Sequence, residues 1–430
     1  MIRNAIKHML AWKKREDRKP LVLKGVRQVG KTWLMLEFGK KYYTNYVYFN
    51  LCEDDKLKPI FENNKNPEEI VEHLSLIGGK KILPEKTLII FDEIHDCPEA
   101  FRALQYFGEK AREYHVVAAG SLLGAMLTQP EFYPNDMVDI LEIKPYYFDE
   151  YLEATDESLY SYYLGIEKDK PIEETLHSRL LEAYNLYLII GGMPECVNSW
   201  ISYRDLKKVA QIQQDIIADY ENTFSIYNES LESGRILMTF RCIPSQLAKP
   251  NERFKYGAIE EGGRVWDFEK AIEWLLSLDI LNRVYNITNI EYPLSEFVMT
   301  DYFKVFMFDT GILKQMAGID NSDILFKDDF KFKGQLTENY MLQQLKGQFD
   351  ADPHYFSTLG GEIDFVLQHG TEIILVDVKS GEDKPSPYFE WYVNAAKPEY
   401  AIRFSKNNYQ KNGRIINIPL YLVRKTKELI

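Results

Sequence analysis

Four residues have the types and spacing needed to hold phosphate groups: Gly25, Gly30, Lys31 and Thr32 complete the pattern G-x-x-x-x-G-K-[ST] in the stretch KGVRQVGKTWL. Glycines at these positions let backbone N–H groups turn toward phosphate oxygens without a Cβ in the way. Lys31 would bind the β- and γ-phosphates and stabilise the reacting one, and the hydroxyl of Thr32 would bind Mg²⁺. An apolar run precedes the glycines and a helical pattern follows, which is the context that this chemistry requires. The stretch therefore predicts a site for ATP and Mg²⁺.

Polar residues follow two further apolar runs, TLIIFDE and HVVAAGS, which end in Asp92 and Glu93 and in Ser121. An acid at the carboxyl end of a buried strand can hold Mg²⁺, so we predict Asp92 as a metal residue. Glu93 is then the base that polarises the attacking water. Ser121 either senses the γ-phosphate or is only a small residue in a turn. His95 could orient Glu93, but a solvent-exposed or helix-capping role is the favoured interpretation.

A separate group of charged residues lies in GGEIDFVLQHGTEIILVDVKSG, where Asp364 belongs to one predicted strand and Asp377 and Lys379 belong to the next. Side chains at positions i and i+2 of a strand share a face, and a hairpin can bring Asp364 beside them. Two carboxylates and a lysine are equipment for metal-assisted hydrolysis of phosphodiesters. Asp364 and Asp377 would bind Mg²⁺ or Mn²⁺, and Lys379 would position or deprotonate the water.

Three interpretations of this second group stay open, because D…[DE]-x-K is a loose pattern. The residues could cleave nucleic acid, they could persist as a remnant that binds metal or DNA, or they could form an ordinary surface salt-bridge group. The basic tail that follows favours a phosphate-backbone partner, since such contacts need positive charge. Its residues are Arg403, Lys406, Lys411 and Arg414. A solvated charged face is the simpler interpretation of this tail and of the equally basic first 31 residues.

Parallel strands joined by helices must position the first site. The runs PLVLKG, NYVYFNL, TLIIFDE and HVVAAGS are short and mainly apolar, as expected of strands buried on both faces, and helical patterns separate them. We therefore predict an α/β protein with a P-loop parallel-sheet core over residues 1–150. Long periodic segments predict a helical lid over 151–230, and short helices before a hairpin predict a winged-helix module over 231–300. Mixed elements, including a three-stranded run, predict an α/β domain over 301–430.

The composition excludes several classes of protein. The 52 basic and 65 acidic residues give a net charge of −13, which argues against a generally basic nucleic-acid binder. The four cysteines form no C-x-x-C pair, so a zinc site or a disulfide framework is not expected. No apolar run approaches the roughly 20 residues that span a membrane, and the start does not read as a signal peptide. We expect a cytoplasmic protein without a membrane partner.

The motifs GVRQVGKT, IIFDEIH and AAGSLL resemble those of the AAA-type ATPases of bacteria and archaea that carry a DUF4143 domain. The resemblance continues in family order through GGMPECV, IPSQLAKPNERFKY, FDTGIL and FKGQLTENYMLQQL. It implies ATP hydrolysis, and it implies a homo-oligomer in which a neighbour supplies an arginine to the nucleotide. The family often has a Gly-Arg pair after the serine strand, and this chain lacks it. Arg102, Arg241 and Arg264 are therefore only candidates for such an arginine.

The 301–430 domain is similar to the PD-(D/E)xK nucleases, a restriction-endonuclease-like fold. That resemblance adds Glu338, in the helical stretch LTENYMLQQL, to the nuclease-like set of Asp364, Asp377 and Lys379. The first functional hypothesis is an ATPase that couples nucleotide hydrolysis to a nuclease-like, DNA-contacting domain. The second is a slow nucleotide switch whose inactive nuclease-like domain docks DNA or a protein partner. A third, weaker one is an assembly factor that acts on a protein and never meets DNA.

Overall fold

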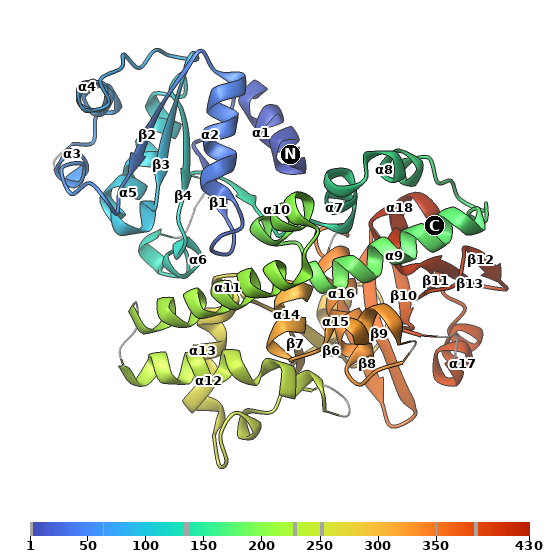
Figure 1. Cartoon of the computed structure of the whole chain (residues 1–430). Helices are drawn as coiled ribbons and strands as arrows, with labels where there is room; N and C mark the ends of the chain where they lie inside the picture. The colour runs from blue at the N-terminus through green and yellow to red at the C-terminus, as the bar shows by residue number, and fades with distance from the viewer. Residues whose placement is uncertain are drawn as a thin grey trace. The chain divides into compact units, whose positions relative to one another are not determined.

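The computed structural model describes residues 3–62, 64–132, 137–226, 230–249, 253–327, 329–349, 351–381 and 386–430. The chain divides into two compact units, which are described separately below (Figure 1). The first unit contains Met1–Lys144 with Ser277–Ile280, and the second contains Pro145–Leu276 with Leu281–Ile430. The predicted boundary at residue 150 lies close to this division, whereas the predicted boundaries at 230 and 300 fall inside the second unit and stay predictions.

The first unit is built on a parallel five-stranded sheet with the strand order β2-β3-β4-β1-β5. The strands are β1 (Leu21–Lys24), β2 (Asn45–Asn50), β3 (Thr87–Asp92), β4 (His115–Ala119) and β5 (Asp139–Glu142). All residues of β3 and β4 are buried, which confirms the prediction from their unbroken apolar runs. Because the strands are parallel, the residues that follow β1, β3 and β4 meet at one edge of the sheet.

Helices accompany this sheet in the first unit. They are α1 (Asn4–Lys14), α2 (Lys31–Tyr42), α3 (Lys58–Glu62), α4 (Pro67–Ile77), α5 (Pro98–Lys110) and α6 (Leu123–Met126). Helix α1, near the start of the chain, buries Ile6 and Met9. In α4, Pro67 occupies the first turn and the Asn66 side chain accepts a hydrogen bond from the backbone N–H of Glu68. Helix α2 begins at Lys31, directly after the glycine loop, so the loop joins a strand to a helix as predicted.

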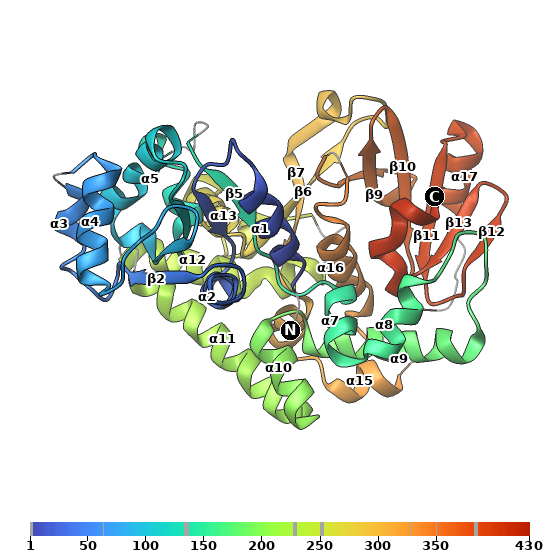
Figure 2. The same ribbon diagram turned by 90° about the horizontal axis from the view of Figure 1, so that it is seen from above.

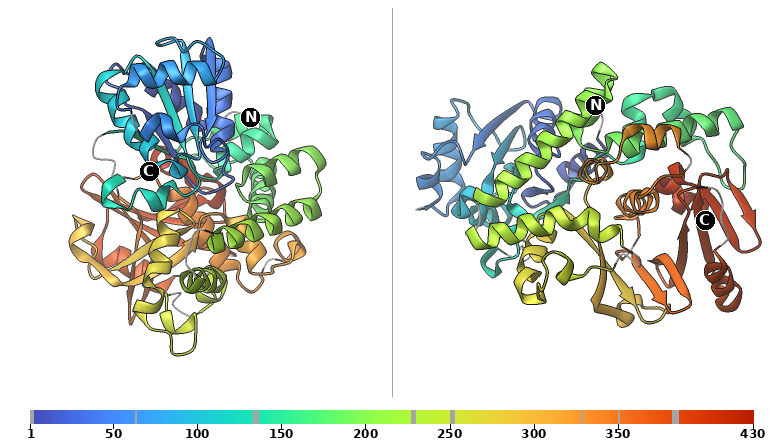
Figure 3. Two further views of the ribbon diagram at one scale, coloured as in Figure 1. Left: turned by 90° about the vertical axis from the view of Figure 1, so that its left-hand side faces the viewer. Right: turned by 60° about the horizontal axis from the view of Figure 1, so that its bottom comes forward.

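The second unit begins with helices: α7 (Phe148–Thr155), α8 (Glu157–Leu164), α9 (Glu174–Ile190), α10 (Pro194–Tyr203), α11 (Leu206–Ile226), α12 (Ser230–Leu247) and α13 (Val265–Ser277). The long helices α11 and α12 pack against each other (Figure 3). This helical stretch agrees with the pattern from which the lid was predicted. None of the described helices in either unit has the length and apolar composition needed to cross a membrane.

The rest of the second unit contains an eight-stranded mixed sheet with the order β12-β13-β11-β10-β9-β8-β6-β7. Its strands are β6 (Leu281–Ile287), β7 (Val298–Met307), β8 (His354–Thr358), β9 (Gly361–His369), β10 (Glu372–Val378), β11 (Tyr400–Ser405), β12 (Gln410–Asn412) and β13 (Ile415–Pro419). The accompanying helices are α14 (Thr310–Met316), α15 (Asn321–Phe326), α16 (Lys333–Leu345), α17 (Pro387–Ala396) and α18 (Thr426–Leu429). Helix α17 packs on β9 and buries Phe389 and Val393. Figure 2 shows β9, β10, β11 and β13 of this sheet in succession.

The hairpin that was predicted as the wing of a winged helix is formed by β6 and β7, after α12 and α13 as expected. It does not stand alone, because β6 also pairs in parallel with β8 through Asn286 and Tyr355. The hairpin therefore extends the sheet of the C-terminal region. The winged-helix assignment stays a prediction.

Two motifs that carried only a family resemblance, GGMPE and FDTGIL, are joined by a hydrogen bond in the interior of the second unit. Asp309 is fully buried and accepts hydrogen bonds from the backbone N–H groups of Gly192 (2.6 Å) and Ile312 (3.0 Å). A Cβ on Gly191 would lie 2.2 Å from Asp309 Oδ1, and the φ of Gly191 is +72°. Burial raises the pKa of Asp309 to about 6, although these N–H donors act in the opposite direction. These residues thus have a structural role.

Candidate functional site

The glycine loop has the geometry that its sequence predicted. A Cβ on Gly25 would lie 2.1 Å from the carbonyl oxygen of Ile143, so no other residue fits there without a shift of the backbone. Gly30 has φ +93° and precedes the first residue of α2, a conformation that side chains with a Cβ rarely adopt. The loop therefore delivers the N-terminus of α2, with its unpaired N–H groups and positive dipole end, to the edge of the sheet.

Lys31 is buried at the start of α2, with 7% of its surface exposed. Its Nζ donates hydrogen bonds to the backbone oxygens of Gly25 (2.7 Å) and Val26 (2.9 Å), so the ammonium lies inside the loop. Burial lowers the pKa of Lys31 to about 8, and the charges of Glu93 and Asp92 oppose this effect. The lysine is therefore mostly protonated at neutral pH, with its charge held beneath the loop.

Thr32 and Asp92 meet directly. The hydroxyl of Thr32 donates a 2.7 Å hydrogen bond to Asp92 Oδ2, and the backbone N–H of Glu93 lies 3.1 Å from Asp92 Oδ1. Tyr48, on β2, donates a second hydrogen bond to Asp92 Oδ2 at 3.0 Å. The sequence analysis did not identify Tyr48, and no motif marks it. Only the pairing of β2 with β3, which places Asn50 opposite Asp92, brings the tyrosine into this site.

Glu93 is fixed through a single carboxylate oxygen. Its Oε2 accepts hydrogen bonds from Ser121 N (2.8 Å) and Ser121 Oγ (3.0 Å), and His95 Nδ1 lies 3.2 Å from the same oxygen. Burial alone would raise the pKa of Glu93, but the hydrogen bonds from His95 and Ser121 outweigh it and lower the pKa to about 2. Glu93 is therefore ionised at neutral pH.

His95 does not have the solvent-exposed role that the sequence favoured. Its side chain is only 7% exposed, and its ring lies between Glu93 and Asp96, with Nε2 3.7 Å from Asp96 Oδ2. The interpretation that His95 is a solvent-exposed residue was wrong. The sequence contained a usable signal, since a histidine two residues after Glu93 in a tight turn can reach back to its carboxylate.

The strand order explains why these residues converge. Because β4 lies between β1 and β3, Ser121 comes out between the glycine loop and the Asp92–Glu93 pair. The site thus combines a buried cation, a hydroxyl–carboxylate pair and an ionised glutamate, all from residues that follow neighbouring strands. Such a set can bind a polyphosphate with a hard cation and can accept a proton from water.

The three arginine candidates differ in their surroundings. Arg102, on α5, forms an ion pair with Glu99 (3.4 Å), and its guanidinium lies over the ring of Phe132. The other two belong to the second unit. Arg241 donates two 2.7 Å hydrogen bonds to Glu221, and Arg264 is exposed beside Trp266. None of these contacts assigns any of the three to a nucleotide.

The second predicted constellation does come together on the eight-stranded sheet. Val376 pairs with Phe365, which brings the neighbouring residues Asp377 and Asp364 side by side. The backbone N–H of Val378 donates a 2.6 Å hydrogen bond to Asp364 Oδ2. Burial, and after it the charge of Asp377, together raise the pKa of Asp364 to about 7. The hairpin that the sequence predicted therefore juxtaposes the two carboxylates.

Cations of the protein itself surround Asp377, which is 4% exposed. Arg403 Nε donates to Asp377 Oδ2 at 2.8 Å, and Lys379 Nζ lies 3.1 Å from Oδ1. The hydroxyl of Ser386 lies 2.8 Å from Oδ1 and 2.9 Å from Oδ2. Both oxygens of Asp377 are therefore engaged. The predicted interpretation of Arg403 as part of a solvated basic tail was wrong, because the residue is buried and paired across β10 and β11.

A buried lysine forms an ion pair with Glu338, as Arg403 does with Asp377. Lys304, on β7, is 2% exposed in its side chain, and its Nζ lies 3.5 Å from Glu338 Oε2 and 2.5 Å from Glu362 Oε1. Its charge also lowers the pKa of Asp364 against the effect of burial. In the part of the chain that the structure describes, no group of three or more His, Cys, Asp or Glu side chains is arranged to hold a metal ion. The acids Glu338, Glu362 and Asp377 each form an ion pair with a lysine or an arginine of the protein. The group therefore does not fit a divalent cation.

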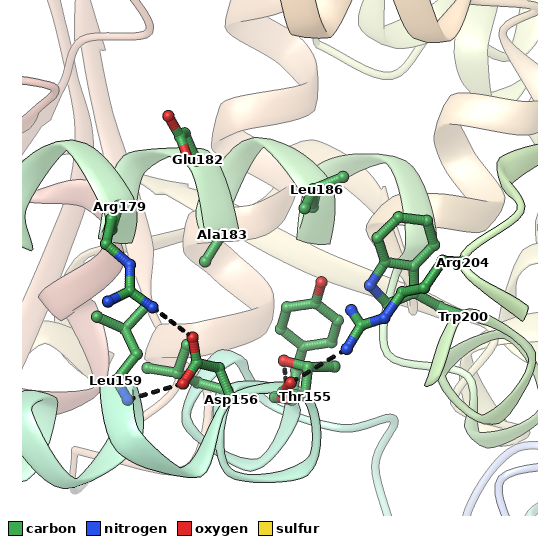
Figure 4. A pocket seen from close by; sticks show the side chains of 11 residues that line it. Thr155, Asp156, Leu159, Arg179, Glu182, Ala183, Leu186, Trp200 and Arg204 are labelled. Carbon is green, nitrogen blue, oxygen red and sulfur yellow. Dashed lines mark hydrogen bonds and ion pairs between the residues drawn. The ribbon is translucent and has the colours of Figure 1, made fainter. Parts of the chain in front are cut away.

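A cavity of about 240 Å³ lies elsewhere in the second unit, between α7, α8, α9 and α10 (Figure 4). Its charged groups bind one another: Arg179 donates to Asp156 at 2.7 Å, and Arg204 donates to the backbone oxygen of Thr155 at 3.3 Å. None of the residues predicted from the sequence to act chemically lines it.

The fold and the first site together define a P-loop ATPase-type protein. Family models agree. An AAA domain model matches residues 17–152, a domain of unknown function (DUF8612) matches 181–323, and a domain of unknown function (DUF4143) matches 333–423. Residues 17–152 therefore match the AAA domain family, and residues 333–423 match the DUF4143 family. The DUF4143 match is shorter than the predicted 301–430 domain, and the predicted winged-helix region falls within the DUF8612 match.

Searches found no match among curated proteins, but found similar solved structures. The Walker-type ATPase PABY2304 of Pyrococcus abyssi aligns over 73% of this chain and 95% of its own, with 12% identity and a TM-score of 0.46. The Thermotoga maritima RuvB Holliday junction branch migration motor aligns over 66% and 90%, with 17% identity and a TM-score of 0.31. The Aeropyrum pernix ORC1 protein in complex with DNA aligns over 73% and 90%, with 13% identity and a TM-score of 0.30. At such scores the family models, the motifs and the strand order carry the classification.

Proposed function

We propose that the first unit binds ATP with Mg²⁺ and hydrolyses it. The observation that carries this proposal is the 2.7 Å hydrogen bond between Thr32 Oγ1 and Asp92 Oδ2. It joins the helix that follows the glycine loop to the acid that ends β3. Two motifs that are 60 residues apart in sequence thus supply a hydroxyl and a carboxylate at one point.

The residues present fit the cofactors. Hydroxyl and carboxylate oxygens are the ligands that Mg²⁺ prefers, so Thr32 and Asp92 would hold the ion, with Asp92 acting through its water shell. The Lys31 ammonium would exchange the carbonyl oxygens of its own loop for oxygens of the β- and γ-phosphates. The close approach of Gly25 to Ile143 keeps the loop narrow, and the N–H groups at the start of α2 face the phosphates.

Glu93 is the proposed base. Its carboxylate is ionised and lies at the same edge of the sheet as Lys31, where it can accept a proton from the attacking water. Lys31 would stabilise the negative charge on the phosphoryl oxygens, and Thr32 and Asp92 would hold the Mg²⁺. Mg²⁺, when bound, supplies further charge neutralisation between the β- and γ-phosphates.

The test is ATP turnover and ATP affinity of the purified protein and of Lys31→Ala. Loss of the buried ammonium should abolish binding or hydrolysis without unfolding the chain. Lys40→Ala is the matched control, because Lys40 is an exposed lysine on the same helix. Turnover in Lys31→Ala equal to that of the unaltered protein would sink the assignment.

We further propose that the DUF4143 region does not cleave nucleic acid but serves as a docking module. The hydrogen bond from Arg403 to Asp377 supports this choice between the two hypotheses, because it commits a predicted metal-binding carboxylate to a cation of the protein. A divalent ion would have to displace both Arg403 and Lys379 from Asp377. The docked partner, DNA or protein, and a homo-oligomeric state stay predictions.

The experiment is incubation with single- and double-stranded DNA and Mg²⁺ or Mn²⁺, with and without ATP, and with Asp377→Ala as the control. We expect no cleavage in any arm. Cleavage that disappears in Asp377→Ala would overturn the proposal, and cleavage that also depends on ATP would indicate a nuclease that ATP regulates. Binding of DNA that weakens with salt would identify DNA as the docked partner. If the protein binds no DNA at any salt concentration, the docked partner would be a protein.

A further inference from the structure

The contacts of Glu93 are unequal between its two carboxylate oxygens. Ser121 N and Ser121 Oγ donate hydrogen bonds to Oε2, and His95 Nδ1 lies 3.2 Å from the same oxygen as an ion-pair partner. They come from two different loops, one after β3 and one after β4. Donors from two loops fix both the position and the rotation of the carboxylate plane, and they leave the lone pairs of Oε1 for another partner.

The carboxylate and the phosphate-binding loop belong to the same edge of the sheet, because Glu93 directly follows β3 and the loop directly follows β1. The charge of Glu93 also acts on Lys31, where it opposes the lowering of the lysine pKa by burial.

The backbone around this arrangement is specialised as well. Glu93 has φ +49°, a left-handed conformation that is uncommon for a residue with a side chain. A Cβ on Gly120 would lie 2.9 Å from His95 Nδ1, so the glycine leaves room for the imidazole. On its other side the ring is flanked by Asp96, 3.7 Å from Nε2. The ring is thus held between two carboxylates in a closed space.

We propose that His95 and Ser121 are positioning residues that hold Oε2 of Glu93 so that Oε1 receives the proton of the attacking water. This inference depends on the proposed ATP hydrolysis at the same site. The water oxygen forms the new bond to the γ-phosphorus as one of its protons passes to Oε1. The bond from phosphorus to the β–γ bridging oxygen breaks, and its electrons stay on ADP. His95 and Ser121 form no bond to the substrate and act only through Glu93.

The test compares His95→Leu with His95→Asn. Leucine removes the contact of His95, and a Glu93 that only Ser121 restrains should lower kcat about tenfold. The affinity for ATP should not change, because the phosphate-binding residues Lys31 and Thr32 are untouched. Asparagine can present an N–H near the position of Nδ1, so His95→Asn should recover most of kcat. A merely structural histidine would not give this separation of kcat from affinity. His73→Leu, at an exposed histidine on α4, is the matched control.

An unchanged or increased kcat in His95→Leu would overturn the proposal, and an increase would mean that the contact restrains Glu93. If His95→Leu does not fold, Ser121→Ala removes one donor without opening a cavity and should lower kcat severalfold at unchanged affinity. Glu93→Gln separates this inference from the proposed function. Loss of turnover in Glu93→Gln with normal turnover in His95→Leu would refute the positioning role alone. Absence of turnover in the unaltered protein would refute both.

Discussion

The replacement of Arg403 by methionine tests whether the charged group on the C-terminal sheet is a structural ion network. Arg403 and Asp377 are only 10% and 6% exposed in their side chains, and their hydrogen bond is 2.8 Å long. Removal of one partner of such a buried pair costs about 3–5 kcal/mol, because it leaves the other charge without compensation. The second ion pair of Arg403, with Glu390, adds little, because Glu390 is 40% exposed. Ser386 and Lys379 remain near Asp377, so we expect the lower end of the range, about 3 kcal/mol.

Hydrogen exchange followed by mass spectrometry suits this measurement, because a chain with two compact units need not unfold in a single transition. The free energy of opening of β10 and β11 should fall by about 3 kcal/mol in Arg403→Met. Arg414→Met, at an exposed position before β13, should leave it nearly unchanged. The double variant with Asp377→Asn should lose less than the sum of the single changes, with a coupling free energy of at least about 1.5 kcal/mol.

Two results would refute the reasoning. A loss below about 1 kcal/mol in Arg403→Met would mean that Asp377 does not depend on the arginine. Additive effects in the double variant would mean the same. Either result would leave the carboxylate of Asp377 available to a divalent cation, and would therefore favour the nuclease hypothesis.

Gly191→Ala should destabilise the second unit by more than about 2 kcal/mol, because a Cβ there lies 2.2 Å from Asp309 Oδ1 and φ is +72°. Thermal unfolding would measure this loss of stability. The control Gly234→Ala, at an exposed position of α12, should instead stabilise the second unit by about 1 kcal/mol. Equal effects of the two substitutions would contradict this reasoning. ATP affinity should fall as pH rises above about 8, since the pKa of Lys31 is lowered to about 8 and the neutral amine cannot bind phosphate by charge. Titration calorimetry at pH 7 and 9 should show roughly a tenfold weakening; equal dissociation constants would refute it.

The sequence was sufficient to predict the central strands of the first sheet, but not its edge strand β5. Strands β1, β3 and β4 are buried on both faces, so their apolar runs identify them without reference to the rest of the chain. Strand β5 was not predicted. It has only four residues and alternates between half-buried and exposed positions, and its parallel pairing with β1 comes from a segment 118 residues away in register.

The same contrast holds for the site. Gly25, Gly30, Lys31 and Thr32 could be found because their spacing is local, and the strand-end rule pointed to the acid pair. Tyr48 could not be found, because its contact with Asp92 depends on the register of β2 against β3. A sequence pattern gives which residues alternate along a strand, but not which residue faces them on the next strand.

On the C-terminal sheet the members of the charged group could be predicted from the sequence, but their partners could not. Asp364 and Asp377 are joined by a short hairpin, so their proximity could be predicted. Arg403 lies 26 residues after Asp377 on a parallel strand, and its pairing depends on how the intervening helix α17 returns the chain to the sheet. Lys304 comes from β7, at the far edge of the same sheet in the strand order. Long-range pairing of this kind decides whether a carboxylate faces a metal or a lysine.

The central claim is that the residues around the glycine loop hydrolyse ATP, and a steady-state measurement of phosphate release tests it most directly. The purified protein with ATP and Mg²⁺ should release phosphate. Glu93→Gln should retain ATP affinity and lose at least about a hundredfold in kcat, because glutamine cannot accept the proton. Equal phosphate release by Glu93→Gln and the unaltered protein would contradict the account.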